Sequence, residues 1–185
     1  PSTAPDAVLP DLKHLGRRVE ALIDRVEGTL SRVDALLPDA VPPVEWKRVT
    51  AARWRKRAGR GYLQPVAHPH AIALDALVAI DAQKAAIEAN TRQFVAGLPA
   101  NNVLLTGSRG TGKSSLVKAM LGAHASQGLR LIEVDKSDLT DLPDIVERVE
   151  ARAERFVVFC DDLTFDAGEP GYKALKVALD GSIAG

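Results

Sequence analysis

The sequence has few of the features that mark secreted, disulfide-stabilised or membrane-spanning proteins. Its single cysteine, Cys160, excludes an internal disulfide, which is typical of a reducing, cytoplasmic setting. No apolar run approaches the roughly 20 residues that a membrane span needs, and no secretory signal is visible after Pro1. The 24 basic and 24 acidic residues cancel, which argues against a constitutive nucleic-acid binder. We therefore expect a cytoplasmic protein without a membrane or a standing nucleic-acid partner.

A long helix is predicted near the start of the 185-residue chain. Apolar residues recur at alternating three- and four-residue steps from Leu12 to Leu36, with β-branched residues at one heptad position and leucines at the other. Ile23 and Leu30 widen this stripe, as in a helix that packs on its own protein. A dimerising coiled coil is the alternative. Pro38 ends the pattern because proline lacks an amide donor.

Residues 44–64 concentrate basic side chains around aromatic ones. The basic residues are Lys47, Arg48, Arg53, Arg55, Lys56, Arg57 and Arg60, and the aromatic residues are Trp46, Trp54 and Tyr62. Such a segment could hold phosphates and stacked bases. The favoured interpretation is a solvated helix face that its tryptophans anchor to the protein. We expect residues 1–64 to form a mostly helical N-terminal extension.

The remainder, residues 65–185, has the pattern of an α/β domain. Three strand-like apolar runs alternate with helical stretches, which is typical of a parallel sheet covered by helices. The predicted strands are 103–106, 129–134 and 156–160, and the predicted helices are 81–96, 114–125, 142–153 and 171–183.

A glycine-rich motif lies between the first predicted strand and its helix. The run Gly107-Ser108-Arg109-Gly110-Thr111-Gly112-Lys113-Ser114 matches G-x-x-x-x-G-K-[ST] in full, the P-loop pattern of nucleoside triphosphate binding. Glycines let backbone amides approach phosphate oxygens closely, and the following helix directs its positive dipole end at the same anion. Lys113 would reach the β- and γ-phosphates, Ser114 would bind Mg²⁺, and Ser115 would complete the phosphate site.

A pair of carboxylates follows the last predicted strand. Asp161 and Asp162 come directly after the apolar run 156–160, at the sheet edge where open α/β sheets bind ligands. We predict that Asp161 contacts Mg²⁺ and that Asp162 orients or activates the attacking water. A helix cap or turn is the structural alternative for this pair.

These motifs resemble those of ATPases of the AAA superfamily. The stretch 74–81 is similar to the segment that lines the adenine pocket in that family, which implies that Leu77 and Val78 touch the base. Residues 62–183, including FCDDL and GEPGYKALK, resemble a bacterial family of AAA-type ATPases of unknown function. The resemblance implies ATP and Mg²⁺ as ligands, a homo-oligomer in which a neighbouring subunit supplies an arginine finger, and a protein client.

The sequence departs from the resemblance in two respects. Most AAA proteins carry Asp-Glu where this chain has Asp161-Asp162, which puts the hydrolysis rate in doubt. The resemblance also implies a fourth strand with a γ-phosphate sensor and a helical lid, and none can be placed before Gly185. That strand would lie between the P-loop strand and the Asp161 strand, and buried amides without partners are costly. We therefore expect an ATPase core that is incomplete at its C-terminus, within a longer protein.

Several alternatives to an ATPase stay open. A nucleotide-dependent switch or scaffold with little hydrolysis would suit the Asp161-Asp162 pair. A nucleic-acid-associated loader would draw on the basic segment 44–64. A GTPase is disfavoured, because the sequence Asp135-Lys136-Ser137-Asp138 lacks the asparagine of the guanine-reading N-K-x-D. A small-molecule kinase would need a basic lid that the sequence does not display.

Overall fold

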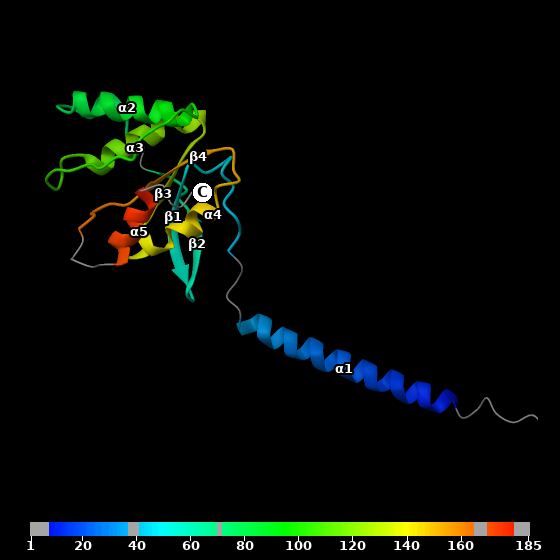
Figure 1. Cartoon of the computed structure of the whole chain (residues 1–185). Coiled ribbons are helices and arrows are strands. Elements are labelled where there is room, and N and C mark those ends of the chain that lie inside the picture. Colours follow the sequence, from blue (N-terminus) through cyan, green and yellow to red (C-terminus); the bar gives the residue numbers. More distant parts are fainter. Residues whose placement is uncertain (1–7, 37–40, 70–71, 165–169, 180–185) are drawn as a thin grey trace, which may run out of the picture. The chain divides into compact units, whose positions relative to one another are not determined.

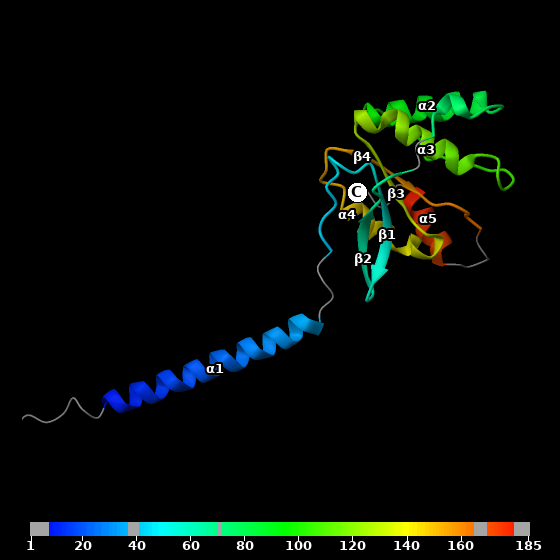
Figure 2. The ribbon, with the colours of Figure 1, turned by 180° about the vertical axis from the view of Figure 1, so that it is seen from behind.

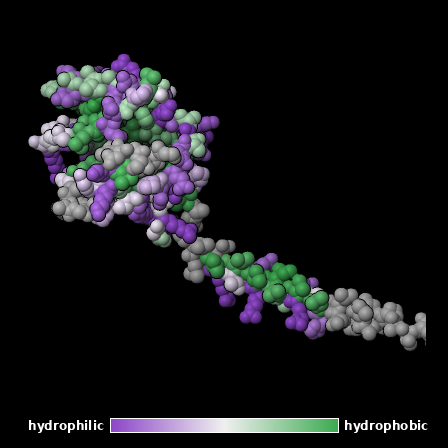
Figure 3. All heavy atoms as spheres, in the orientation of Figure 1, coloured by the Kyte–Doolittle hydropathy of each residue, from purple (hydrophilic) through white to green (hydrophobic). Residues whose placement is uncertain are grey.

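The computed structural model describes residues 8–36, 41–69, 72–164 and 170–179 of the chain (Figure 1). The chain divides into two units, residues 1–41 and residues 42–185. The described part of the first unit is mainly one helix, α1 (Val8–Leu36), in agreement with the predicted long helix. Figure 3 shows apolar residues gathered along one side of α1 and polar residues along the other. Among the apolar residues, Leu15, Leu22 and Leu30 are each more than half exposed.

The second unit is a mixed α/β fold built on a four-stranded sheet. The strands are β1 (Ala51–Arg57), β2 (Arg60–Pro65), β3 (Leu129–Glu133) and β4 (Arg155–Phe159). Their order is β2-β1-β3-β4. β1 pairs with β3 and β3 pairs with β4 in parallel, whereas β2 adds to β1 as an antiparallel hairpin partner. The three parallel strands confirm the predicted α/β class.

Helices and short 3-10 turns cover the two faces of this sheet. The α-helices are α2 (Asp81–Val95), α3 (Lys113–His124), α4 (Leu142–Glu147) and α5 (Pro170–Leu179), and the 3-10 turns are η1 (Leu74–Ala76), η2 (Ala125–Gln127) and η3 (Lys136–Asp141). Helices α2 and α3 lie side by side when seen from either side (Figures 1 and 2). None of the helices that the structure describes is long and apolar enough to cross a membrane.

Alternating residues of β1 divide the core between the two faces. Ala52 and Trp54 pack with Ile132 of β3 and with buried residues of η3 and α4. Ala51 points to the opposite face, where a smaller cluster includes Leu131 and Leu121 of α3. Successive residues of a strand point to opposite faces, so this one strand contributes to both clusters.

The basic segment corrects the prediction of a mostly helical extension. Residues 51–57 and 60–65 are strands of the sheet, and Trp46 and Trp54 are only 2% and 1% exposed. The predicted role of the tryptophans as anchors is confirmed, but on strand and turn backbone instead of a helix. Base stacking on either tryptophan is excluded by this burial. The reason is tertiary, because β1 gains hydrogen-bonding partners on both sides from β2 and β3.

The predicted strand 103–106 is also corrected. These residues form neither strand nor helix, and Val103 and Leu104 are 51% and 74% exposed. A strand requires a neighbour whose amides and carbonyls complete its ladder. Within the described ranges, β4 pairs only with β3, and no strand lies beside residues 103–106. Helix α4 also ends at Glu147, six residues before the predicted end at residue 153, and residues 180–183 of the last predicted helix lie outside the described residues.

Candidate functional site

The glycine-rich loop 107–114 ends in the first turn of α3. Gly107, Gly110 and Gly112 have φ values of 140°, 84° and 85°, a region that L-residues with side chains rarely adopt. Gly112 is the N-cap residue of α3 and offers no side-chain acceptor to the helix. The first amides of a helix have no intrahelical partner. The loop therefore presents free N–H groups at the positive end of the α3 dipole.

The side chain of Lys113 forms hydrogen bonds within the loop. Its Nζ donates to the carbonyl oxygens of Gly107 and Ser108 at 2.9 and 2.8 Å. The hydroxyl of Thr111 also donates to the Ser108 carbonyl, at 2.8 Å. These contacts hold the ammonium group within the loop that precedes α3. Backbone carbonyls carry only partial negative charge, so a phosphate oxygen would be a stronger partner for this cation.

Ser114 and Asp161 meet although they are distant in sequence. The Oγ of Ser114 donates to Oδ2 of Asp161 at 2.6 Å, across 47 positions of the chain. Ser114 lies in the first turn of α3, and Asp161 follows the C-terminal end of β4. A hydroxyl and a carboxylate oxygen are both hard ligands of the kind that Mg²⁺ prefers. The two oxygens could therefore bind a magnesium ion in place of the hydrogen bond that joins them.

Asp162, the second carboxylate after β4, has a left-handed backbone. Its φ is +56°, and its backbone N–H donates to Oδ1 of Asp161 at 3.0 Å. Asp161 is thus held by a hydroxyl on one oxygen and by an amide on the other. Asp162 itself is exposed, and its side chain makes no hydrogen bond or ion pair with the residues that the structure describes. A free carboxylate beside a fixed one is available for proton transfer with a bound molecule.

The other predicted ligand residues lie in the loop, in α3 and beside η1. Ser108 and Arg109 are exposed in the loop, and Ser115 is half-buried in α3. Leu77 follows η1, which packs against α3, and its carbonyl accepts from Lys84 Nζ at 2.7 Å. Leu77 is half-buried, whereas Val78 is 79% exposed. Their contact with an adenine base stays a prediction.

Two observations limit the chemistry at this edge. In the part of the chain that the structure describes, no three His, Cys, Asp or Glu side chains cluster as a metal site. A magnesium ion held here would take most of its ligands from phosphate and water, as Mg²⁺ commonly does.

Burial, followed by the charges of Asp135 and Asp161, raises the pKa of Cys160 to about 11. The thiol is therefore protonated at neutral pH and is a poor nucleophile.

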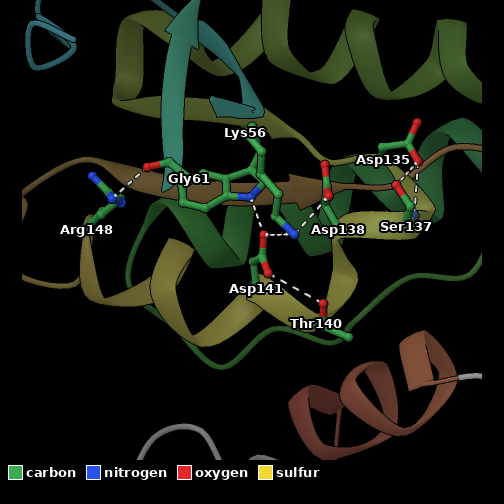
Figure 4. Close-up of polar contacts among 9 residues, drawn as sticks. Lys56, Gly61, Asp135, Ser137, Asp138, Thr140, Asp141 and Arg148 are labelled. Carbon is green, nitrogen blue, oxygen red and sulfur yellow. Dashed lines mark hydrogen bonds and ion pairs between the residues drawn. The ribbon is translucent and has the colours of Figure 1, made fainter. Parts of the chain in front are cut away.

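A polar network that the sequence analysis missed holds β1 against η3 (Figure 4). Lys56 Nζ lies 2.8 Å from Asp141 Oδ2 and 3.2 Å from Asp138 Oδ1. The indole N–H of Trp54 donates to the same Asp141 oxygen at 2.8 Å. The alternation Arg53-Trp54-Arg55-Lys56-Arg57 before Ala58-Gly59 could have indicated a hairpin strand. This network is structural, because it fixes the sheet beside the segment that leads from β3 to α4.

The same contacts shift the pKa values of Asp141 and Lys56 in this network. Partial burial raises the pKa of Asp141, but hydrogen bonds from Lys56 and Trp54 outweigh it and leave the pKa below its usual value. The hydrogen bond to Asp141, and then that to Asp138, raises the pKa of Lys56. The backbone and hydroxyl of Ser137 lower the pKa of Asp135, which caps η3. All three groups are thus fixed in their charged forms at neutral pH.

Comparison with curated proteins and with solved structures finds no match for this chain. A family model described as "Protein of unknown function (DUF815)" matches residues 47–185. This range includes the β1–β2 hairpin, the glycine-rich loop, and the Asp161-Asp162 pair. The chain therefore belongs to the DUF815 family, whose function its description leaves open.

Proposed function

We propose that this chain is a P-loop ATPase of the AAA type that binds ATP with Mg²⁺ and hydrolyses it. The observation that carries the proposal is the hydrogen bond between Ser114 and Asp161 at 2.6 Å. It joins the last residue of a complete P-loop motif to the first acidic residue after a parallel strand. A merely glycine-rich turn would have no reason to lie against that carboxylate.

The loop supplies the positive charge that a triphosphate needs. Three glycines with positive φ open the backbone, α3 directs its N-terminal amides at the loop, and Lys113 lies within it. When phosphate binds, Lys113 would exchange its two carbonyl contacts for charged oxygens. This exchange replaces partially charged acceptors by fully charged ones, which strengthens the electrostatic attraction to the ammonium group.

Each residue then has a separate role. Lys113 and the loop amides of residues 107–115 bind the phosphates, and Ser114 with Asp161 would hold Mg²⁺. A bound magnesium ion neutralises phosphate charge and orients the terminal phosphoryl group. Asp162 would orient the attacking water and accept its proton. Catalysis of this kind depends on positioning and charge stabilisation by the protein.

The D-K-S-D segment that follows β3 is unsuited to guanine recognition, which favours ATP over GTP as the ligand. Asp135, the first residue of the D-K-S-D sequence, accepts from the amide and hydroxyl of Ser137 at 3.0 and 2.8 Å. Asp138 pairs with Lys56 at 3.2 Å. Both carboxylates therefore have structural partners and are unsuited to reading a guanine ring. Leu77 and Val78, by resemblance, would contact the adenine.

A nucleotide-dependent switch with little hydrolysis is the second candidate. It is favoured by Asp162, whose carboxylate is one methylene shorter than the glutamate usual in AAA proteins. The left-handed backbone of Asp162 also directs this side chain differently from an extended residue. Phosphate release at saturating ATP separates the two functions.

Calorimetric titration of ATP with Mg²⁺ tests the proposal. The protein should bind ATP, and Lys113→Ala should abolish the heat of binding. Lys118→Ala, five residues further along α3, is the matched control because it removes the same charge outside the loop. Equal binding by the wild type and Lys113→Ala would refute the assignment of the site.

A further inference from the structure

The β1–β2 hairpin has two faces of different chemistry. Directly opposite residues of the two strands share a face, and the register pairs Arg55 with Tyr62 and Arg57 with Arg60. One face carries Ala52, Trp54 and Leu63, all buried in the core. The other face, here called the arginine face, carries Arg53, Arg55, Arg57, Arg60 and Tyr62. It is independent of the ATP site proposed above.

The hairpin projects this face beyond the rest of the sheet. β1 pairs with β3 only from Ala51 to Arg53, whereas its pairing with β2 continues to Arg57 and Arg60. The two-residue turn has φ values of 49° at Ala58 and 75° at Gly59, the left-handed conformation of a type I′ hairpin turn. The turn therefore holds the register that places Arg57 opposite Arg60.

Most other basic groups of this segment are already paired, but those of the hairpin tip are not. Lys56 forms ion pairs with Asp138 and Asp141 on the core face. Arg53 pairs with Glu133 at 2.9 Å. Before the hairpin, Arg48 pairs with Glu45. Arg57 and Arg60 are exposed, and neither forms an ion pair within the described ranges of the chain. Like charges directly opposite on a two-stranded ribbon repel each other, so an anion between them would stabilise the tip.

We propose that the arginine face binds the phosphodiester backbone of a nucleic acid. Alternate residues of a strand stand about 6.6 Å apart, so Arg55 and Arg57 lie one repeat apart on this face, with Arg60 directly opposite Arg57. Guanidinium groups match phosphate oxygens in bidentate geometry, and a two-stranded ribbon is narrow enough to enter a groove of a duplex.

The mode of binding follows from which side chains are exposed. The buried Trp46 and Trp54 cannot stack on bases, and Tyr62 is the one aromatic residue of this face. Contacts are therefore to phosphates, and binding is independent of base sequence and sensitive to salt. The net charge of zero is compatible with such a patch, because association depends on the local field.

The test is fluorescence anisotropy of the whole chain with a labelled duplex and the matching single strand, without nucleotide. The wild type should bind, and its log affinity should fall linearly with log salt concentration. In Arg57→Gln/Arg60→Gln this slope should be shallower by about 1.8. Each of the two phosphates that the variant no longer neutralises accounts for about 0.9. Between about 50 and 200 mM NaCl, wild-type affinity should consequently fall about twelvefold more than that of the variant. Lys173→Gln/Lys176→Gln on α5 removes the same charge and should leave the slope unchanged.

Two further variants keep the result interpretable. Arg57→Lys/Arg60→Lys keeps the charge and should retain the wild-type slope. If Arg57→Gln/Arg60→Gln loses its fold by circular dichroism, Arg55→Gln/Arg60→Gln takes its place. The proposal is overturned if the wild type binds neither oligonucleotide at low salt, or if the glutamine variants bind like the wild type. Binding only to vesicles of phosphatidylserine, abolished in the same variants, would also overturn it in favour of a membrane surface.

Discussion

Ser114 Oγ lies 2.6 Å from Asp161 Oδ2 and donates a hydrogen bond to it. This contact joins the start of α3 to the end of β4 and brings a hydroxyl and a carboxylate to the same edge of the sheet. Asp161 is held on its other oxygen by the amide of Asp162 at 3.0 Å. The carboxylate is therefore oriented before any ligand binds, which is the condition for a preorganised site.

Asp161→Asn should weaken the dependence of ATP binding on magnesium. The amide cannot supply the negative oxygen that Mg²⁺ prefers. Mutation of residues that only orient a metal ligand typically costs about 10- to 100-fold in metal affinity, so loss of Asp161 itself should cost at least about tenfold. Calorimetric titration of ATP with and without Mg²⁺ measures the effect. Asp144→Asn, the same change at an exposed position of α4, is the control. An unchanged magnesium dependence in Asp161→Asn would remove Asp161 from the site.

Asp162→Asn should preserve ATP binding and slow phosphate release. The substitution keeps the size of the side chain but removes the base, and general base catalysis typically contributes about 10²- to 10⁴-fold. Steady-state phosphate release at saturating ATP measures turnover, and calorimetry checks that affinity is retained. If the wild type binds ATP without turnover, the switch function is supported. Turnover in Asp162→Asn equal to that of the wild type would assign water activation to another group.

Asp141→Asn should destabilise the sheet at neutral pH by about 1–2 kcal/mol, because Lys56 and Trp54 lose a charged acceptor. The folded-state pKa of Asp141 is lowered, so its stabilising contribution is present above the unfolded value of about 3.9. This contribution is lost as pH falls through the lower folded-state value. The difference between the two proteins should therefore shrink in strong acid.

Urea unfolding at several pH values measures this difference. Asp144→Asn serves again as a control, because its carboxylate is exposed and surface carboxylates contribute little. A stability difference for Asp141→Asn that stays constant from neutral to acidic pH would show that charge is not its cause.

Val26→Asp in α1 should disrupt self-association of the chain. Val26 is 48% exposed, like Val19 and Val33 at 47% and 46%. The three valines occupy equivalent heptad positions, and Leu22 and Leu36 occupy the second position, which Thr29 interrupts, a pattern close to the one that a coiled coil prefers. Burial of a charge without a partner would raise the dissociation constant at least about tenfold. Sedimentation velocity measures the change.

Ser31→Asp introduces the same charge on the polar side of α1 and is the matched control. A monomeric wild type would favour the first interpretation of the sequence pattern, in which α1 packs on its own protein, over the coiled-coil alternative. An oligomer that survives Val26→Asp would place the self-association elsewhere in the chain.

Several elements could be predicted from the sequence, because their patterns are local. The helix-favouring run 81–96, closed by Gly97 and Pro99, predicts α2. The apolar runs at 129–134 and 156–160 predict β3 and β4 to within one residue. The motif 107–114 likewise indicates the left-handed glycines and the start of α3. These features depend on the residues of each segment, so neighbouring parts of the chain are not needed to find them.

Other features could not be predicted from the sequence, because they depend on partners that are distant along the chain. Residues 51–65 became strands because β3 offered a free edge to β1, and this pairing buried Trp54 and turned the arginines outward. Residues 103–106 formed no strand in the described structure because no neighbour completes their ladder, although their composition favours one. The meeting of Ser114 and Asp161 arises in the same way, since only the packing of α3 beside β4 can bring them together. Hydrogen bonds between strands and contacts across a sheet edge are properties of pairs of segments, and a single segment does not specify them.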